Sequence, residues 1–347
     1  MKFNGRSCML MMLLCAAVSC SRTEDPAPEP PPVVNKGTSS TETDTTAVAG
    51  QYHEYKVLAH KTDSAITSSD EPHYVYIDTR TSLRKKLMLF LGGTNTAPKS
   101  FTEFSKTAAA MGYHVINVEY SNAVTVRVCE QAEDMECFTR YHDAVIDGGT
   151  HSDLVHVTEA DGIMNRVIKL LKYLNAQDTT QGWNQFYTGD MLQWPKIVVV
   201  GHSQGGDHAA YLAYKYAVDR LVVLCSPNDF SRKYNQPADW CGQPFATSVG
   251  KIYGLMHKRD ELVPPEEHYA AWKAMRLLDA ADTTAADKDS YKGAHALYTD
   301  IEPNPSASKY KSKHNAPIID EAIPTGEKGE HLKQVWKYLL GEEGPSE

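Results

Sequence analysis

Residues 196–206 combine a serine of nucleophile type with the glycines that a very sharp turn requires. The stretch reads Lys-Ile-Val-Val-Val-Gly-His-Ser-Gln-Gly-Gly, so an apolar run leads directly into a Gly-x-Ser-x-Gly pattern centred on Ser203, and residues 208–217 continue with helical composition. In the order strand, turn, helix, such a serine projects from the tip of the turn, and small residues two positions before and after it let the two backbones pass closely. The pattern predicts that Ser203 is a nucleophile and that the backbone N–H of Gln204 binds an oxyanion.

The pattern alone has limited weight, because glycine and serine are common enough for it to arise by chance in about one chain in ten of this length. The alternative interpretation is a glycine-rich turn in an α/β fold of another kind. The remaining segments must therefore supply a fold that positions the serine and its partners.

The rest of the chain alternates strand-like and helix-like segments. This order is typical of an α/β fold with a mostly parallel sheet flanked by helices. The first two strands alternate in polarity and are expected to pair antiparallel. The expected strands are residues 52–59, 73–79, 86–91, 113–120, 196–200, 221–224, 251–256 and 294–301, and the expected helices are residues 101–111, 159–175, 208–217, 264–277 and 331–340. Residues 121–156 and 226–248 interrupt the alternation and are expected to be irregular insertions.

The order of these segments over residues 52–341 resembles the α/β-hydrolase superfamily. The segment Leu-Gly-Gly-Thr-Asn-Thr-Ala-Pro at 91–98, the pair Gly182-Trp183, the turn at Ser203 and the pair His314-Asn315 are similar to the BPSS-type bacterial α/β-hydrolases. The resemblance implies a serine hydrolase in which the nucleophile, an acid and a histidine follow one another along the chain, with no cofactor.

A serine hydroxyl requires an imidazole that accepts its proton and a carboxylate that orients the imidazole. The segment Lys-Arg-Asp-Glu-Leu-Val-Pro at 258–264 is similar to the acid-bearing loop of the superfamily, where an aspartate precedes an apolar-Pro turn. The resemblance therefore implies Asp260 as the acid. Glu261 and Asp229 are the alternatives, the latter because some members place the acid one strand earlier.

The resemblance implies His314, in the loop Ser-Lys-His-Asn-Ala-Pro, as the base. His331, at the start of the last helix, is the alternative. His295 lies inside an expected strand and should pack there. His202 precedes the nucleophile, and its side chain should point away from the serine hydroxyl.

The second oxyanion donor is expected after the strand 86–91, where Gly92-Gly93 allows the backbone to approach a substrate. The resemblance implies the N–H of Thr94. The two insertions lie where relatives build caps over the site. They carry residues that could line a pocket, although loop aromatics and arginines also pack or face water: Tyr120, Arg140, Tyr141 and Trp240.

The N-terminus resembles the signal peptide of a bacterial lipoprotein over residues 1–19. Lys2 and Arg6 precede an apolar stretch that ends in Ala-Val-Ser-Cys at Cys20. The resemblance implies that Cys20 is lipidated and begins the mature chain; an ordinary secretory signal is the alternative. Residues 20–50 are rich in Pro, Thr, Ser and acidic residues and are predicted to form a disordered tether. The globular domain is then residues 51–347. The N-terminal lipid is expected to hold it at the outer membrane of the bacterial cell envelope, on either the periplasmic or the outer surface.

Four cysteines remain once Cys8 and Cys15 leave with the signal and Cys20 carries lipid. An even number in an oxidising compartment predicts two disulfides. Among the three possible arrangements, the pairing of cysteines close in sequence is preferred: Cys129–Cys137 and Cys225–Cys241. The alternative is that Cys225 is a buried free thiol. No Cys-x-x-Cys or His-Glu-x-x-His pattern is present, so no metal is expected.

The net charge of −9 is spread along the chain without a block of like charge, which argues against a nucleic-acid partner. The sequence predicts an exported serine hydrolase, most simply a carboxylic-ester hydrolase acting on a small-molecule or glycan-linked ester. A peptidase, thioesterase or acyltransferase would use the same groups. The alternative is a non-catalytic surface binding lipoprotein on a hydrolase scaffold.

Overall fold

The computed structural model describes residues 50–69, 71–279, 284–288, 291 and 293–342. The signal peptide, Cys20 and nearly all of the tether lie outside these residues. The described residues all fall within one unit that spans Val48–Glu347. Among the helices of this part of the chain, none is both long enough and apolar enough to cross a membrane.

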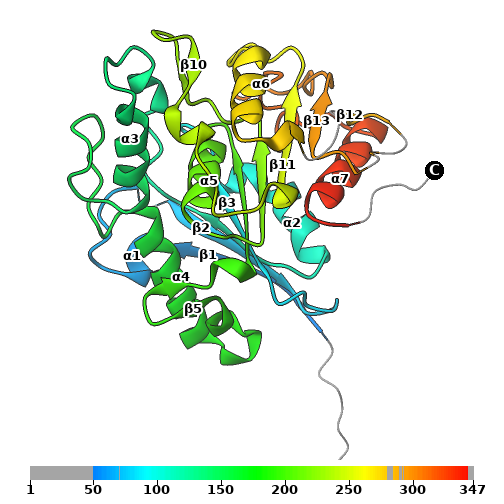
Figure 1. Cartoon of the computed structure of the whole chain (residues 1–347). Coiled ribbons are helices and arrows are strands. Elements are labelled where there is room, and N and C mark those ends of the chain that lie inside the picture. Colours follow the sequence, from blue (N-terminus) through cyan, green and yellow to red (C-terminus); the bar gives the residue numbers. More distant parts are fainter. Residues whose placement is uncertain (1–49, 70, 280–283, 289–290, 292, 343–347) are drawn as a thin grey trace, which may run out of the picture. The chain divides into compact units, whose positions relative to one another are not determined.

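Within the described residues, nine strands form one sheet in the order β1-β2-β4-β3-β7-β8-β11-β13-β12 (Figure 1). The pairs β1–β2 and β2–β4 are antiparallel, and the other pairs are parallel. The predicted α/β class, the mostly parallel sheet and the antiparallel opening strands are confirmed. The strands are β1 (Tyr52–Leu58), β2 (Pro72–Asp78), β3 (Leu87–Leu91), β4 (His114–Val118), β7 (Ile197–His202), β8 (Arg220–Leu224), β11 (Ile252–His257), β12 (Thr284–Ala285) and β13 (Ala296–Thr299).

The central strands are apolar on both faces because helices cover both sides of the sheet. In β3 every residue is buried, and alternate side chains enter two different cores. Helices α3 (Glu136–Ile146), α4 (Ile163–Gln177), α5 (Gln204–Lys215) and α6 (Pro265–Ala274) contribute to one core. Helices α2 (Thr102–Ala110) and α7 (Glu327–Leu339) contribute to the other, and the short α1 (Ala59–Thr62) follows β1.

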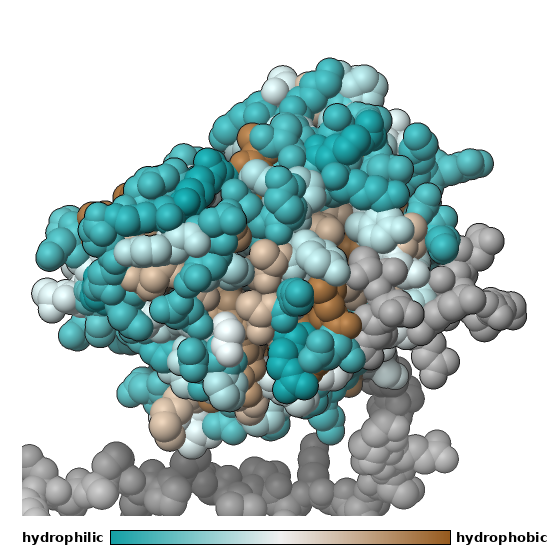
Figure 2. Space-filling view, turned by 45° about the horizontal axis from the view of Figure 1, so that its top comes forward, coloured by the Kyte–Doolittle hydropathy of each residue, from teal (hydrophilic) through white to brown (hydrophobic). Residues whose placement is uncertain are grey.

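The outer surface contrasts with these cores. Polar residues cover most of the face seen in Figure 2, and hydrophobic residues occupy a smaller area near its centre. Large hydrophobic side chains that are exposed lie mostly at scattered points of the chain, as Leu58, Met191 and Tyr269 do. The burial of apolar side chains in the two cores is therefore the main stabilising contribution that the fold displays.

The segment 121–156 differs from the prediction, because it contains α3 as well as irregular chain. The buried residues Phe138, Tyr141 and Val145 recur at three- and four-residue spacing, as expected for a helix that packs on a sheet. His142 lies on the same buried face and interrupts the apolar pattern in the sequence. Only its tertiary hydrogen bonds, described below, explain how it is accommodated there.

The segment 226–248 is irregular, as predicted. It holds a small hairpin of β9 (Phe230–Ser231) and β10 (Gln236–Pro237), followed by a 3-10 turn, η6 (Asp239–Gly242). A second hairpin, β5 (Tyr187–Thr188) with β6 (Met191–Leu192), precedes β7. The remaining short 3-10 turns are η1 (Pro98–Phe101), η2 (Val126–Cys129), η3 (Thr179–Gln181), η4 (Trp183–Phe186), η5 (Trp194–Lys196), η7 (Val249–Lys251) and η8 (Leu277–Asp279).

Candidate active site

Ser203 lies in a sharp turn between β7 and α5. Its backbone has φ 52° and ψ −130°, a region that a residue with a side chain occupies at a free-energy cost of about 1–3 kcal/mol. The turn is held by its own backbone groups: the Ser203 N–H donates to the Leu224 carbonyl at 3.0 Å, and the Ser203 carbonyl accepts from the N–H groups of Gly206 and Asp207. The predicted strand–turn–helix order at this serine is confirmed.

The glycines on either side of the serine are sterically required. A Cβ at Gly201 would lie 2.1 Å from the carbonyl oxygen of Gly205, and a Cβ at Gly205 would lie 2.1 Å from the carbonyl oxygen of Leu91. Both contacts are with backbone atoms, which cannot move aside as a flexible side chain can. The strand β3, the turn and the start of α5 are therefore packed backbone to backbone.

Asp260 and His314 form a buried hydrogen-bonded pair. His314 Nδ1 donates to Asp260 Oδ2 at 2.5 Å, which leaves Nε2 as the ring nitrogen available to accept a proton. The other carboxylate oxygen, Oδ1, accepts from the backbone N–H groups of Leu262 at 2.9 Å and Val263 at 3.0 Å. These contacts fix both the carboxylate plane and the ring that it orients.

A second histidine, His268, also contacts the carboxylate. His268 Nε2 lies 3.4 Å from Asp260 Oδ2, and its Nδ1 lies 3.0 Å from the carbonyl oxygen of Pro227. Burial opposes ionisation of Asp260, but the hydrogen bonds from His268 and His314 outweigh it and hold the pKa of the carboxyl well below its usual value. Asp260 is thus ionised at neutral pH and able to stabilise a positive charge on His314.

Ser203 and His314 line the same cavity, whose volume is about 340 Å³. The serine comes from the end of β7, and Asp260 follows the end of the parallel strand β11. His314 comes from the irregular chain between β13 and α7. The structure therefore brings together the three residues that the sequence singled out, on elements more than 100 residues apart for Ser203 and His314.

The alternative acids have other contacts. Glu261 Oε1 accepts from the backbone N–H of Lys313 at 2.8 Å, so it binds the chain next to the histidine and not its ring. Asp229 Oδ2 accepts from His142 Nε2 at 2.6 Å and from Trp240 Nε1 at 2.7 Å. Burial raises the pKa of Asp229 to about 7.

The alternative histidines also lie elsewhere or act differently. His331 Nε2 contacts the carbonyl oxygen of Ala286 at 2.6 Å and lines a separate cavity. His295 lies just before β13 and not inside a strand, but it packs as predicted and stacks on Tyr253. His202, which was expected to point away from the serine hydroxyl, also lines the cavity that Ser203 lines.

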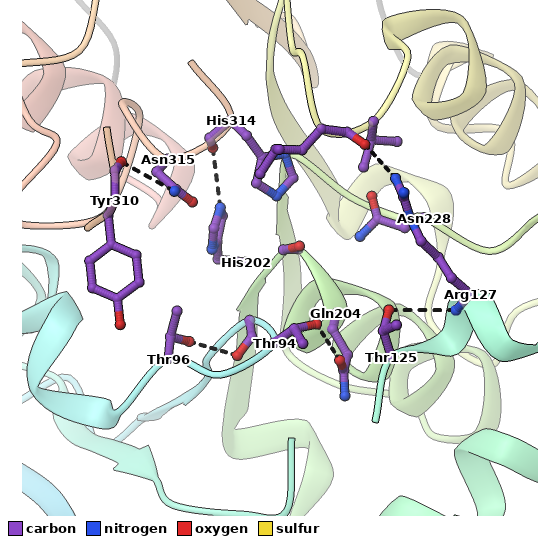
Figure 3. A pocket seen from close by; sticks show the side chains of 14 residues that line it. Thr94, Thr96, Thr125, Arg127, His202, Gln204, Asn228, Tyr310, His314 and Asn315 are labelled. Atoms are coloured by element: carbon purple, nitrogen blue, oxygen red, sulfur yellow. Dashed lines mark hydrogen bonds between the residues drawn. The ribbon is translucent and has the colours of Figure 1, made fainter. Parts of the chain in front are cut away.

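His202 supports the loop that carries His314. Its Nε2 donates to the carbonyl oxygen of His314 at 3.2 Å (Figure 3), and the two rings lie 4.9 Å apart. Burial lowers the pKa of His202 to about 3, so its ring is neutral at neutral pH. A neutral ring in contact with His314 avoids repulsion when His314 becomes positively charged.

Thr94 and Gln204 adjoin each other at the cavity. The Thr94 hydroxyl donates to Gln204 Oε1 at 2.5 Å, and both residues line the cavity (Figure 3). Gln204 is the first residue of α5, so its N–H has no acceptor within the helix. The Gly93 carbonyl accepts from Thr96 Oγ1 at 2.7 Å and Asn122 Nδ2 at 2.9 Å. Since C=O and N–H point in opposite directions across a trans peptide, the Thr94 N–H faces away from those donors.

The side chains proposed from the sequence as pocket residues do not line this cavity. Tyr120 donates to the Gly92 carbonyl at 2.6 Å, and Tyr141 donates to the Val124 carbonyl at 2.7 Å, so both brace loops that form the walls. Trp240 binds Asp229, and Arg140 is exposed and paired with Asp134 at 2.8 Å. Loop residues that the sequence did not single out complete the lining: Thr96, Thr125, Arg127, Asn228, Leu262, Val263, Tyr310 and Asn315.

The cysteines follow one of the two predicted pairings. Cys129 and Cys137 form a disulfide with a Cα–Cα distance of 5.6 Å, which closes the chain between η2 and the start of α3. The Cys225–Cys241 disulfide is wrong, because both thiols are free and buried. They occupy different environments: Cys225 Sγ lies within 4.8 Å of polar atoms of Asp260 and His314, whereas Cys241 packs in the α5-side core with Trp240. Burial raises the pKa of the Cys225 thiol well above its usual value, so it remains protonated beside the pair.

Neither a protein-family model nor a curated protein sequence matches this chain. The chemistry of the site is therefore inferred from its geometry: a serine in a strained turn, a buried aspartate–histidine pair, and Gln204 and Thr94 beside the serine at one cavity.

Proposed function

We propose that this protein is a serine hydrolase of the α/β-hydrolase type that cleaves carboxylic esters through an acyl-enzyme. One observation carries the proposal. Ser203, held in a turn that only small neighbours permit, lines the same cavity as a histidine whose Nδ1 is bound to a buried, ionised aspartate. A protein that only bound a ligand would have no need for this combination.

In the proposed reaction the Ser203 hydroxyl attacks the ester carbonyl carbon while His314 Nε2 accepts its proton. The Asp260 carboxylate stabilises the imidazolium that results. The N–H groups of Gln204 and Thr94 bind the oxyanion. When the C–O bond to the alcohol breaks, His314 returns the proton to the leaving alkoxide, which leaves Ser203 acylated.

Water then completes the cycle. It attacks the acyl carbonyl and gives its proton to His314, and the second tetrahedral intermediate collapses to release the carboxylic acid and restore the Ser203 hydroxyl. Each donor to the oxyanion typically contributes about 3–4 kcal/mol of transition-state stabilisation. Both halves of the reaction use only side chains and backbone N–H groups of the protein, together with water.

The test is the Ser203→Ala variant, measured with 4-nitrophenyl acetate and with a fluorophosphonate probe that labels activated serines. We expect loss of labelling and a decrease in kcat of at least about 1,000-fold, because removal of a nucleophile leaves only the oxyanion donors and binding. The matched control is Ser152→Ala, which removes a half-buried serine outside this cavity, whose hydroxyl accepts from the Leu154 N–H. Unchanged ester hydrolysis in Ser203→Ala, at unchanged thermal stability, would contradict the proposal. A wild-type protein that the probe fails to label would favour a non-catalytic binding protein.

The same groups cleave amides and thioesters or transfer acyl groups to alcohols. A panel of acyl esters, acetylated sugars, thioesters and peptide amides, each assayed with the wild type and Ser203→Ala, separates these activities. We expect esters to be the best substrates, because the alcohol leaves more readily than an amine and the cavity is open to water.

A further inference from the structure

One side of the cavity carries a positive charge. Figure 3 shows Tyr310 and Asn315 on one side and Thr125, Arg127 and Asn228 on the other. The Arg127 side chain extends from η2 along this second side, where its guanidinium donates to the carbonyl oxygen of Leu262, 135 residues away in the sequence. The arginine thus joins the disulfide-closed segment to the loop that follows Asp260.

This guanidinium retains hydrogen-bonding capacity. A guanidinium has five N–H donors, and the bond to Leu262 uses one of them. Among the described residues, no carboxylate forms an ion pair with Arg127. Glu267 is close enough for the charge of Arg127 to affect its pKa, but it lies 3.5 Å from Arg232 and pairs with it.

The other ionisable groups at the cavity do not supply a competing charge. Asp260 is buried behind His314 and already accepts from two histidines and two backbone N–H groups. His202 is neutral at neutral pH, because burial lowers its pKa to about 3. Within the lining formed by the described residues, Arg127 is therefore the permanent cation.

The size of the cavity favours a small molecule, and the rest of its lining is mixed in polarity. Residues with hydroxyl or amide groups are the most numerous, but carbon atoms, including those of Leu262 and Val263, form the larger part of the exposed wall. The volume of about 340 Å³ lies at the lower end of small-molecule sites.

We propose that Arg127 forms an anion subsite of this cavity and that the enzyme prefers small esters that carry one carboxylate group. This proposal rests on the proposed ester hydrolysis at Ser203. A carboxylate matches the guanidinium in charge and can accept two parallel N–H bonds from it. A single arginine would neutralise only part of a phosphate dianion. The whole protein has a net charge of −9 and therefore repels anions. A local positive charge such as that of Arg127 is needed to attract an anionic substrate to the cavity.

The experiment compares two matched pairs of esters. In the first pair the carboxylate is on the acyl side: mono-4-nitrophenyl adipate against its methyl ester. In the second it is on the alcohol side: 3-acetoxybenzoate against methyl 3-acetoxybenzoate. The measured quantity is the ratio of kcat/KM for the charged ester to that for the neutral ester. We expect the full-length wild type to show a ratio of at least about 10 in one pair, as for a charge-assisted hydrogen bond, and a decrease in this ratio at high salt.

The variants are Arg127→Gln, Arg127→Lys and the matched control Arg140→Gln, which removes an arginine of α3 that is paired with Asp134 and does not line the cavity. We expect Arg127→Gln to bring the ratio to about 1, Arg127→Lys to keep part of it, and Arg140→Gln to leave it unchanged. If Arg127 only braced the Leu262 loop, Arg127→Gln would lower turnover of both esters equally and the ratio would not move, which would overturn the proposal.

The outcomes also separate this inference from the proposed function. A wild type that cleaves the neutral esters and shows a ratio near or below 1 in both pairs would overturn the anion subsite and leave ester hydrolysis intact. A wild type that cleaves none of the four esters and is not labelled by a fluorophosphonate would overturn both. Thermal unfolding of each variant shows whether a change in rate reflects a change in folding.

Discussion

Two buried carboxylates show how the number of donors around a residue decides its charge. Asp260 accepts from His314, His268 and two backbone N–H groups, and its pKa is held well below the usual value although burial opposes this. Glu119, just after β4, accepts a hydrogen bond from the Ser69 hydroxyl. Burial dominates there and raises the pKa of Glu119 to about 7, against the attraction of Arg166. The first carboxylate is suited to catalysis, and the second is a cost to the fold.

Replacing Glu119 by glutamine should stabilise the protein at high pH. Because the pKa rises on folding from 4.5 to about 7, the folded state binds more protons than the unfolded state between these values. The stability that this group provides is fully present below pH 4.5 and is lost as the pH rises through 7. Urea unfolding at pH 5 and pH 8 should show that Glu119→Gln is more stable than the wild type at pH 8, by up to about 3 kcal/mol, with a much smaller difference at pH 5.

The control for this measurement is Glu159→Gln, which changes an exposed glutamate. We expect no pH-dependent difference from the wild type in that variant. A Glu119→Gln protein whose stability relative to the wild type is the same at both pH values would show that Glu119 is ionised in the folded state throughout.

At the scale of elements, the cavity is built from two kinds of segment. The sheet and its turns provide Ser203 and Asp260, and the surrounding loops provide the walls. The segment from η2 to α3 is closed by the disulfide between Cys129 and Cys137 and held by Tyr141, which donates to the Val124 carbonyl. Its own conformation thus depends on a covalent link and on a hydrogen bond from a tyrosine hydroxyl.

Removal of this disulfide should weaken the fold moderately and preserve its architecture. A crosslink over a sequence separation of 8 restricts the unfolded chain by about 2.5 kcal/mol in the chain-entropy account. We expect the double variant Cys129→Ser, Cys137→Ser to lose about 2–3 kcal/mol in urea unfolding, with the far-UV circular dichroism of the wild type. A reductant should destabilise the wild type to the same extent and leave the variant unaffected. Equal stability of the two proteins without reductant would show that the crosslink does not contribute.

The elements that depend on local sequence could be predicted, and those that depend on distant contacts could not. The turn at Ser203 follows from two glycines beside it, and the buried strands follow from continuous apolar runs. Arg127 lines the cavity because it reaches the carbonyl of Leu262, and nothing near residue 127 reveals that contact.

Polar residues in the core explain two further differences. The helix α3 has no clean apolar face in the sequence, because His142 is buried there and binds His208 at 2.9 Å and Asp229 at 2.6 Å. Cys225 and Cys241 are close in the sequence, but the turn after β8 and the excursion that follows direct them to different places. Asp260 and His314 were identified through a family resemblance, and the structure adds the hydrogen bond that joins them.

At the scale of the whole molecule, the globular domain and the predicted lipid anchor fall on different residues of the chain. The described residues begin at residue 50, so a tether of about 30 residues would join Cys20 to β1. A flexible chain of this length has a root-mean-square end-to-end distance of roughly 30 Å. We propose that the enzyme works at the bacterial cell envelope within this distance of a membrane.

Substitution of the predicted lipidated cysteine should release the protein from membranes. A diacylated cysteine anchors through its hydrocarbon chains, and the helices of the described part of the chain offer no alternative span. After expression of full-length protein in a Gram-negative host, we expect the wild type in the detergent phase of a Triton X-114 partition and Cys20→Ser in the aqueous phase. Both proteins should hydrolyse 4-nitrophenyl acetate equally. Detergent partitioning of Cys20→Ser would contradict the predicted anchor.

The wall that contains Arg127 has a consequence for the engineering of new specificities. Thr125, Arg127 and Asn228 come from segments other than the turn that holds Ser203 and the loop that holds His314. Combinatorial libraries at these three positions could therefore sample new substrate preferences while the reactive groups and the packed glycines stay constant. Such a division between a fixed reaction centre and a variable wall would let one scaffold give rise to a series of esterases that differ in the acid or alcohol they accept.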